Sequence, residues 1–202
     1  MILMTAIKVF NKYEMDGITV EDPGLKRYIS LDARIVPRTG GKNVGIKFHK
    51  SKTFIVERLM NKLTNSGHKS KKHLRSSGSF TGKGTTVYGI IQSAFEIIEQ
   101  KTKQNPMLVL VKAIEHAAPR EEIIAIEYGG ARYPKAVEMA PQRRVDYVLR
   151  IFVQSAYSKS FKKKRAVESA LADEIIAAFN ISPQSDAISK KLELERQADS
   201  SR

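Results

Sequence analysis

The segment GSFTGKGT, at residues 78–85, is the closest approach to a nucleotide-binding motif in this sequence. A phosphate-binding P-loop has four residues between its first glycine and its Gly-Lys pair, and Ser or Thr follows the lysine. Here three residues separate Gly78 from Gly82, Gly84 follows Lys83, and no strand pattern precedes the segment. The spacing therefore argues against nucleotide hydrolysis.

The histidines and the neighbouring carboxylates give no catalytic or metal-binding pattern either. His68 and His73 lie in a segment without a carboxylate, and the chain has no cysteine, so we expect imidazoles that are solvated or face RNA. Glu121–Glu122 and Asp173–Glu174 are adjacent in the chain, so their side chains point in different directions and favour a role in complementing helix charge. We expect no metal, no cofactor and no enzyme activity.

The distribution of basic residues is more informative. The chain has 202 residues, 35 Lys+Arg against 21 Asp+Glu, and a net charge of +14. Residues 65–85 contain five basic residues and no acid, and residues 142–165 contain eight basic residues against Asp146 alone. Such segregation predicts a face that binds a polyanion. A membrane is disfavoured because no apolar run approaches ~18 residues and no expected helix has the Trp/Phe-rich face of an interfacial anchor.

The elements that carry these residues are mostly helical. Apolar residues recur at helical spacing in six segments, and Pro106 and Pro141 suit the first turn of a helix. The expected helices cover residues 51–63, 85–101, 105–118, 141–157, 163–179 and a segment from 185 onwards. We therefore predict a mainly α fold, a six-helix domain.

Residues 121–140 are predicted to form a β-hairpin arm. Apolar residues alternate with others on both sides of Gly129–Gly130, which is a strong hairpin signal. Pro134 cannot donate a ladder hydrogen bond, so it should lie near the tip or on an unpaired edge. Without a third strand the arm should project from the domain.

The sequence also suggests where the domain begins. Residues 1–48 are irregular, with possible short strands at 6–10 and 18–20, and are predicted to be an N-terminal extension lying on a helical domain at 49–202. Residues 65–84 are rich in Ser, Gly, Lys and Thr, which predicts a flexible basic loop that an anion would order.

One face of the helix expected at 141–157 is strongly basic. Arg143, Tyr147 and Arg150 share a face, and the basic run continues through Lys159 to the cluster at 162–165 with Asp146 as the single acid. Solvated helices usually mix charges of both signs, so phosphate contact is favoured over a solvated face. The scarcity of exposed aromatics favours recognition of backbone and shape.

Several segments resemble one family, the small-subunit ribosomal protein S7 family in its archaeal and eukaryotic branch. They are NPMLVLVKAIEHAAPREE at 105–122, YGG at 128–130, PQRRVD at 141–146, AISKKLELER at 187–196, GLKRYI at 24–29 and FIVERLM at 54–60. The segments occur in the family's order over nearly the whole chain. The resemblance implies six helices with a hairpin arm and a structural role in the small ribosomal subunit.

The resemblance also implies partners and a location. The expected partners are the 3′ major domain of small-subunit rRNA and neighbouring proteins of the subunit head, whose assembly the protein would nucleate. The arm would lie near the exit-site tRNA and the mRNA exit channel, and the protein would be cytoplasmic, in the ribosome.

The predicted rRNA-binding residues come from this resemblance and from the basic loop. They are Lys50, Lys52, Lys69, Lys71, Lys72, Arg75, Lys83, Arg143, Arg144, Arg150, Lys162, Lys163, Lys164 and Arg165, and the tip of the arm is Gly129, Gly130, Ala131, Arg132 and Tyr133. The alternative is a free-standing nucleic-acid-binding regulator that uses 143–150 as a recognition helix. That helix lacks the set of base-reading side chains expected for the major groove.

Overall fold

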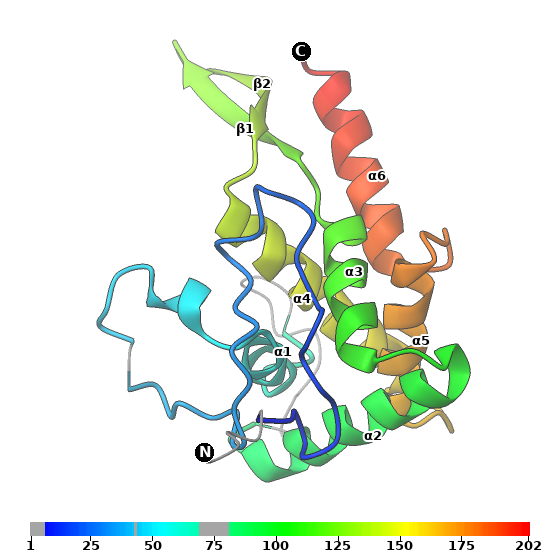
Figure 1. Cartoon of the computed structure of the whole chain (residues 1–202). Coiled ribbons are helices and arrows are strands. Elements are labelled where there is room, and N and C mark those ends of the chain that lie inside the picture. Colours follow the sequence, from blue (N-terminus) through cyan, green and yellow to red (C-terminus); the bar gives the residue numbers. More distant parts are fainter. Residues whose placement is uncertain (1–6, 43, 69–80) are drawn as a thin grey trace.

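The computed structural model describes residues 7–42, 44–68 and 81–202, and within these it confirms a mainly α fold with a two-stranded hairpin (Figure 1). In chain order the elements are a 3₁₀ helix at His49–Lys52, α1 (Ile55–Leu63), α2 (Gly84–Thr102), α3 (Pro106–Ala117), β1 (Glu121–Tyr128), β2 (Ala131–Glu138), α4 (Pro141–Ser160), α5 (Val167–Phe179) and α6 (Asp186–Asp199).

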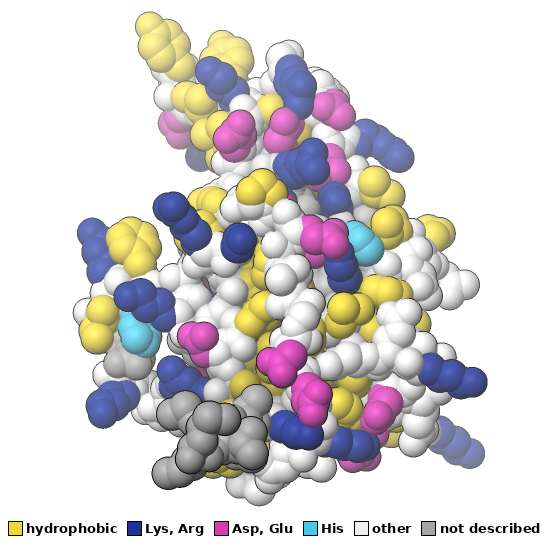
Figure 2. Space-filling model, in the orientation of Figure 1, with side chains coloured by type: hydrophobic (Ala, Val, Ile, Leu, Met, Phe, Trp, Pro, Cys, Tyr) yellow, Lys and Arg dark blue, Asp and Glu magenta, His cyan; other side chains and the backbone are white. Residues whose placement is uncertain are grey.

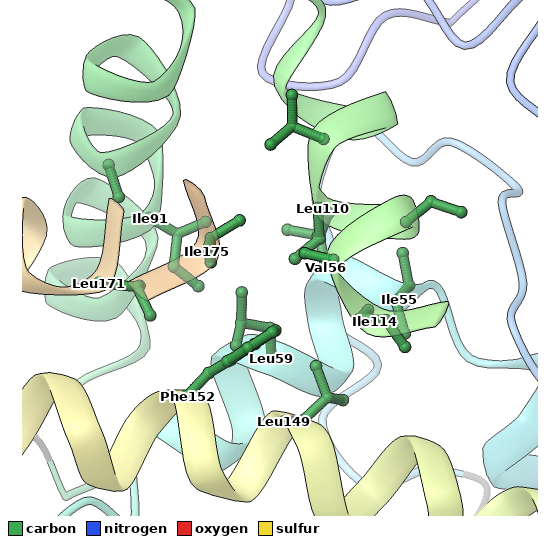
Figure 3. Packing of buried hydrophobic residues seen from close by; sticks show 14 of the residues in the cluster. Ile55, Val56, Leu59, Ile91, Leu110, Ile114, Leu149, Phe152, Leu171 and Ile175 are labelled. Atoms are coloured by element: carbon green, nitrogen blue, oxygen red, sulfur yellow. The ribbon is translucent and has the colours of Figure 1, made fainter. Parts of the chain in front are cut away.

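The first five helices meet in one hydrophobic core. Figure 3 shows Leu59 of α1 close to Phe152 of α4, with side chains of α2, α3 and α5 around them. Leu59 and Phe152 are fully buried. Because α1 contributes seven buried residues out of nine, this short helix is nearly enclosed by the others.

Local signals explain several helix boundaries. The side chain of Asn105 accepts a hydrogen bond from the Met107 N–H, 3.0 Å, in front of Pro106. The side chain of Ser185 likewise caps α6 by accepting from the Ile188 N–H. Both residue types are favoured N-caps because they satisfy free backbone donors in the first turn.

Two boundaries differ from the prediction. The fifth helix begins at Val167 instead of residue 163, and residues 161–165 form a turn. Four consecutive cations at a helix N-terminus would oppose the helix dipole, so the helix starts after them. The first helix begins at Ile55, because a 3₁₀ turn at His49–Lys52 and an extended Thr53 precede it.

The short strands expected at 6–10 and 18–20 are wrong for their described residues, 7–10 and 18–20. Among the described residues of the N-terminal segment there are isolated bridges, Val9 with Tyr13 and Ser30 with Phe54, and no named strand. The apolar side chains pack onto helices instead. The Phe10 ring lies 5.5 Å from that of Phe95 in α2, in an edge-to-face arrangement.

Buried residues in the described part of the N-terminal segment 1–48 pack into the same hydrophobic core as the helices. Val9, Leu25 and Ile29 are buried in the same hydrophobic cluster as α1 to α5. Figure 1 shows this segment, in dark blue, running along α3. The predicted boundary between an N-terminal extension at 1–48 and a helical domain at 49–202 stays a prediction. Buried residues from both sides of this boundary pack in one hydrophobic cluster.

The hairpin extends beyond the helices at one end of the molecule (Figure 1). Tyr128 pairs with Ala131 across Gly129 and Gly130, whose φ angles of 59° and 83° suit glycine. Pro134 lies opposite Ala125 in the described sheet of two strands, where each strand has a free edge. α6 runs beside the base of the arm, where Arg202 donates to Glu121 at 2.6 Å.

A buried carboxylate fixes α6 to the helices beneath it. Glu174 is 1% exposed, and one of its oxygens accepts from Ser155 Oγ at 2.7 Å and Lys159 Nζ at 2.6 Å. The other accepts from Ser185 Oγ at 2.8 Å and the Ala187 N–H at 3.2 Å. A carboxylate at the start of a helix also complements its dipole, so Glu174 has the charge-complementing role expected from the sequence.

The core packing predicts the effect of one truncation. Phe152→Ala should lower the free energy of unfolding by about 3–5 kcal/mol, because it leaves a cavity among helices that cannot fully collapse. Urea unfolding followed by circular dichroism measures this. Leu192→Ala, at a side chain that is 53% exposed, is the control and should change stability by about 0.5 kcal/mol or less. Equal effects would contradict the packing described.

Candidate nucleic-acid interface

A cleft of about 740 Å³ lies between the loop at 38–50, helix α1 and helix α4. Its lining is strongly cationic. Among the described residues, the lining includes five Lys or Arg side chains, Arg38, Lys50, Arg58, Lys62 and Arg150, against one carboxylate, Glu57. Concave surfaces lined by charge of one sign focus the electrostatic field, so this cleft attracts anions.

Asp146 of α4 joins the elements that form the cleft. Its carboxylate pairs with Lys50 in the 3₁₀ turn and with Arg58 of α1, the latter at 3.2 Å. Arg58 is 2% exposed and also donates to the Tyr28 carbonyl at 2.6 Å. Burial alone would raise the pKa of Asp146, but the two cations together lower it below its ordinary value. Asp146 therefore stays ionised at neutral pH.

The three other cations of the cleft, Arg38, Lys62 and Arg150, have no salt bridge within the described part of the chain. Lys62 is half-buried, and burial lowers its pKa, assisted by the positive charges of Lys50 and Arg150 and opposed by Asp146. The Arg150 guanidinium lies 5.6 Å from the centre of the Tyr147 ring. Their positive charge is available to a ligand.

A second buried carboxylate positions the loop. Glu57 is 2% exposed and accepts hydrogen bonds from the backbone N–H and hydroxyl of Thr39, at 2.8 and 2.6 Å. Arg38, the neighbour of Thr39, thereby lies at the edge of the cleft. The same loop exposes Val44, Ile46 and Phe48. Figure 2 shows Lys and Arg side chains interleaved with hydrophobic ones along this part of the surface.

Among the residues predicted from the sequence, Lys50 and Arg150 meet in this cleft. Lys52 ends the 3₁₀ turn and Lys83 precedes α2, and both are exposed. Neither lines the cleft. Four further predictions fall outside the described residues, namely Lys69, Lys71, Lys72 and Arg75.

The two arginines at the start of α4 differ from each other. Arg143 is exposed and donates twice to Glu122, at 3.0 and 2.7 Å. Arg144 is 9% exposed and donates to the Pro119 carbonyl at 3.0 Å and to Asp22 at 2.9 Å. Arg144 thus joins the N-terminal segment to the base of the arm, and its contact with RNA stays a prediction.

The cluster Lys162–Arg165 lies in the turn between α4 and α5, so it does not continue the helical stripe. All four side chains are exposed, and Arg165 pairs with Asp173, which also pairs with Lys101 at 2.5 Å. This turn is a second basic surface, and its residues do not line the cleft.

All five residues of the arm's tip, 129–133, are exposed. Arg132 lies 3.5 Å from Glu127 on the neighbouring strand, and Tyr133 is 58% exposed. Tyr133 pairs with Ile126 on one face of the ribbon, and Tyr128, on the same face, is 81% exposed. The arm thus presents an aromatic and aliphatic face beyond the helices.

Sequence reasoning missed several residues of the cleft. They are Arg38, Phe48, Arg58, Lys62 and, as the organiser, Asp146. Asp146 had a signal, since it is the single acid in a basic segment. Arg58 and Lys62 lie four residues apart, on one face of α1, but only the packing of the loop and α4 makes that face part of a cleft.

Taken together, a helical core, a cationic cleft and a projecting arm are the features of a protein that binds a polyanion such as RNA. The described residues include no group of His, Asp and Glu that could hold a metal ion. Within the same residues, no helix has the length and apolarity to cross a membrane.

Comparison with known proteins defines the family. The model of the family "Ribosomal protein S7p/S5e" matches residues 25–202. The small ribosomal subunit protein uS7 of Nanoarchaeum equitans is 52% identical, covering 97% of this chain and 99% of that protein. The uS7 protein of Archaeoglobus fulgidus is 46% identical, covering 96% and 94%. The chain therefore belongs to the ribosomal protein S7p/S5e family. It is a structural, non-enzymatic protein of the small ribosomal subunit.

The Asp146 geometry predicts a pH dependence. The pKa of Asp146 is lower in the folded protein than in the unfolded chain, where it is about 4. The ion pairs of Asp146 therefore stabilise the fold fully above about pH 4. This stabilisation is lost as the pH falls through the pKa of Asp146 in the folded protein. Asp146→Asn should therefore cost about 3 kcal/mol at pH 7, and progressively less below about pH 4. Unfolding free energies of both proteins across this range measure the difference. A difference independent of pH would contradict the ionised pair.

Proposed function

We propose that the chain binds the 3′ major domain of small-subunit rRNA through the cleft between α1, α4 and the loop at 38–50. The observation that carries the proposal is the cationic lining of this cleft, where Lys62 and Arg150 have no salt bridge in the described part of the chain. The family resemblance supplies the identity of the RNA. In this proposal the bound protein helps to nucleate the head of the subunit, where neighbouring proteins join later, in the cytoplasm.

The proposed mechanism is electrostatic and geometric. Lys and Arg side chains that neutralise phosphates release condensed counterions, which makes binding favourable and dependent on salt. Phosphate contacts fix orientation and carry little sequence information. The rigid packing of α1 against α4 would hold the cations at spacings that suit a folded RNA, so that shape contributes to selectivity.

The arm has a separate role in this proposal. The family resemblance suggests that it lies near the exit-site tRNA and the mRNA exit channel. Its exposed Tyr128 and Tyr133 support contact with a ligand, because the helices leave them uncovered.

The alternative of a free-standing regulator gains no support. A recognition helix needs several exposed side chains at its groove-facing end, but Arg144 is buried and Arg143 is paired with Glu122. Asp146, in the same helix, pairs with two cations of the same chain, Lys50 and Arg58.

Binding to separate RNA domains tests the proposal. Filter binding with transcripts of the 3′ major domain and, as the control, the 5′ domain of an archaeal small-subunit rRNA should show tighter binding to the former at physiological salt. Equal affinity for both transcripts would contradict specific recognition of the 3′ major domain.

The cleft proposal predicts a change in salt dependence. Lys62→Gln and Arg150→Gln should each lower affinity for the 3′ major-domain transcript roughly 5- to 10-fold at 0.1 M salt, and reduce the slope of log K against log salt by ~0.7–0.9, the value for one phosphate contact. Lys190→Gln, at an exposed cation paired with Glu193 on α6, is the control and should change neither. Unchanged slopes for the first two variants would remove the cleft from the interface.

A deletion separates the arm from the fold. Removing Gly129–Tyr133 and rejoining the strands should leave the thermal unfolding midpoint nearly unchanged, because these residues are exposed. Subunits carrying the deletion should bind the 3′ major domain normally and show altered retention of exit-site tRNA. A large loss of thermal stability would show that the arm contributes to the core.

A further inference from the structure

Phe48 is an aromatic residue that the fold does not explain. Its side chain is 75% exposed and its φ angle is 59°. The His49 N–H donates to the Ile46 carbonyl at 3.2 Å, so Phe48 occupies the third position of a four-residue turn. A positive φ at this position favours Gly or Asn, and it strains a bulky side chain.

Other residues with positive φ have local reasons. Phe10 has a φ of 54°, but its ring is buried and contacts Phe95. Lys103 and Ile181 follow the ends of α2 and α5, where a left-handed residue is a common helix terminus. Phe48 is the residue before the 3₁₀ helix His49–Lys52 and its side chain makes no capping hydrogen bond there. Left-handed residues are common at the C-terminal ends of helices, so neither burial nor a C-terminal helix end accounts for its positive φ. Strained backbone of this kind concentrates at ligand-binding sites.

The surroundings of Phe48 indicate the ligand. It lines the cleft together with Val44 and Ile46, which are 86% and 58% exposed. Lys47 Nζ lies 5.7 Å from the centre of the Phe48 ring, and Lys62 lines the same cleft. An exposed ring beside a basic groove is the combination that binds unpaired nucleotides, since the bases stack while the phosphates are neutralised. An apolar protein surface would instead leave these cations desolvated and without partners.

We propose that Phe48 stacks against an unpaired nucleobase of the RNA whose phosphates occupy the cleft. This inference rests on the proposed function and adds a preference to it. The cleft selects RNA that offers an unpaired nucleotide, such as a junction or bulge, over an uninterrupted duplex. The strained turn holds the ring in the solvent before the RNA arrives.

The chain contains no tryptophan, so Phe48→Trp provides a fluorescent reporter at this position. The probes are a short oligoadenylate and a chain of equal length whose ribose-phosphates carry no bases, both end-labelled so that anisotropy reports binding. We expect the fluorescence of the Phe48→Trp variant to be quenched by oligoadenylate and not by the base-free chain. Leu192→Trp, on α6 and away from the cleft residues, is the control and should not be quenched by either.

Two further substitutions separate stacking from folding. Phe48→Leu and Phe48→Gly should weaken oligoadenylate binding roughly 5-fold or more, in line with the loss of one stacked base, and leave binding of the base-free chain unchanged. The thermal unfolding midpoint should not fall in Phe48→Gly, because glycine adopts this φ without strain.

Three outcomes would overturn the stacking proposal. They are equal quenching by both probes, unchanged affinity in the Phe48 variants, and no binding of either probe by the wild-type chain. Binding of the 3′ major-domain transcript decides the proposed function separately. If the wild-type chain binds that transcript and Lys62→Gln weakens the binding, the proposal that the cleft binds rRNA is supported. In that case only the proposal that Phe48 stacks on a base is contradicted.

Discussion

The ionised carboxylate of Asp146 is the interaction on which the cleft depends. It draws the 3₁₀ turn at His49–Lys52 and helix α1 towards α4 through Lys50 and Arg58. Without it, cations on three elements would face one another with no counter-charge, and like charges at such distances repel strongly when partly buried. The attraction holds elements on different sides of the cleft together, and Lys62 and Arg150 keep no salt bridge within the described residues, so their charge is available to a ligand. The proposed RNA contacts follow from this arrangement.

Two further carboxylates, those of Glu57 and Glu174, also hold elements of the fold together. Glu57 and Glu174 are 2% and 1% exposed, so each carboxylate satisfies internal donors and contributes little negative charge to the surface. Glu57 holds the loop through Thr39, and Glu174 joins α4, α5 and the start of α6. Interior acids thus position exterior cations. A basic RNA-binding protein can in this way fold with well-defined geometry and still present a cleft with an excess of positive charge.

Much of the fold was predictable, because helical and alternating periods are local properties of a sequence. The hairpin around Gly129–Gly130 and the helices starting at Pro106 and Pro141 followed from turn chemistry and apolar spacing. The strands expected at 6–10 and 18–20 were wrong over their described residues, because apolar side chains there pack against the helices. The sequence predicted no cleft, but two of its lining residues, Lys50 and Arg150, are among the predicted rRNA-binding residues, and that role stays a prediction. Its remaining residues depend on contacts across long separations, as between Asp146 and Arg58, and the burial of Arg144 depends on Asp22.

The most direct test is ultraviolet crosslinking of protein to RNA within isolated small ribosomal subunits, with the crosslinked residues identified by mass spectrometry. If the cleft is the principal RNA interface, the crosslinked peptides come from the loop at 44–50, from α1 and from the middle of α4 around Arg150. Crosslinks confined to α2, the turn at 161–165 and the outer face of α6, with none from the cleft, would contradict the account.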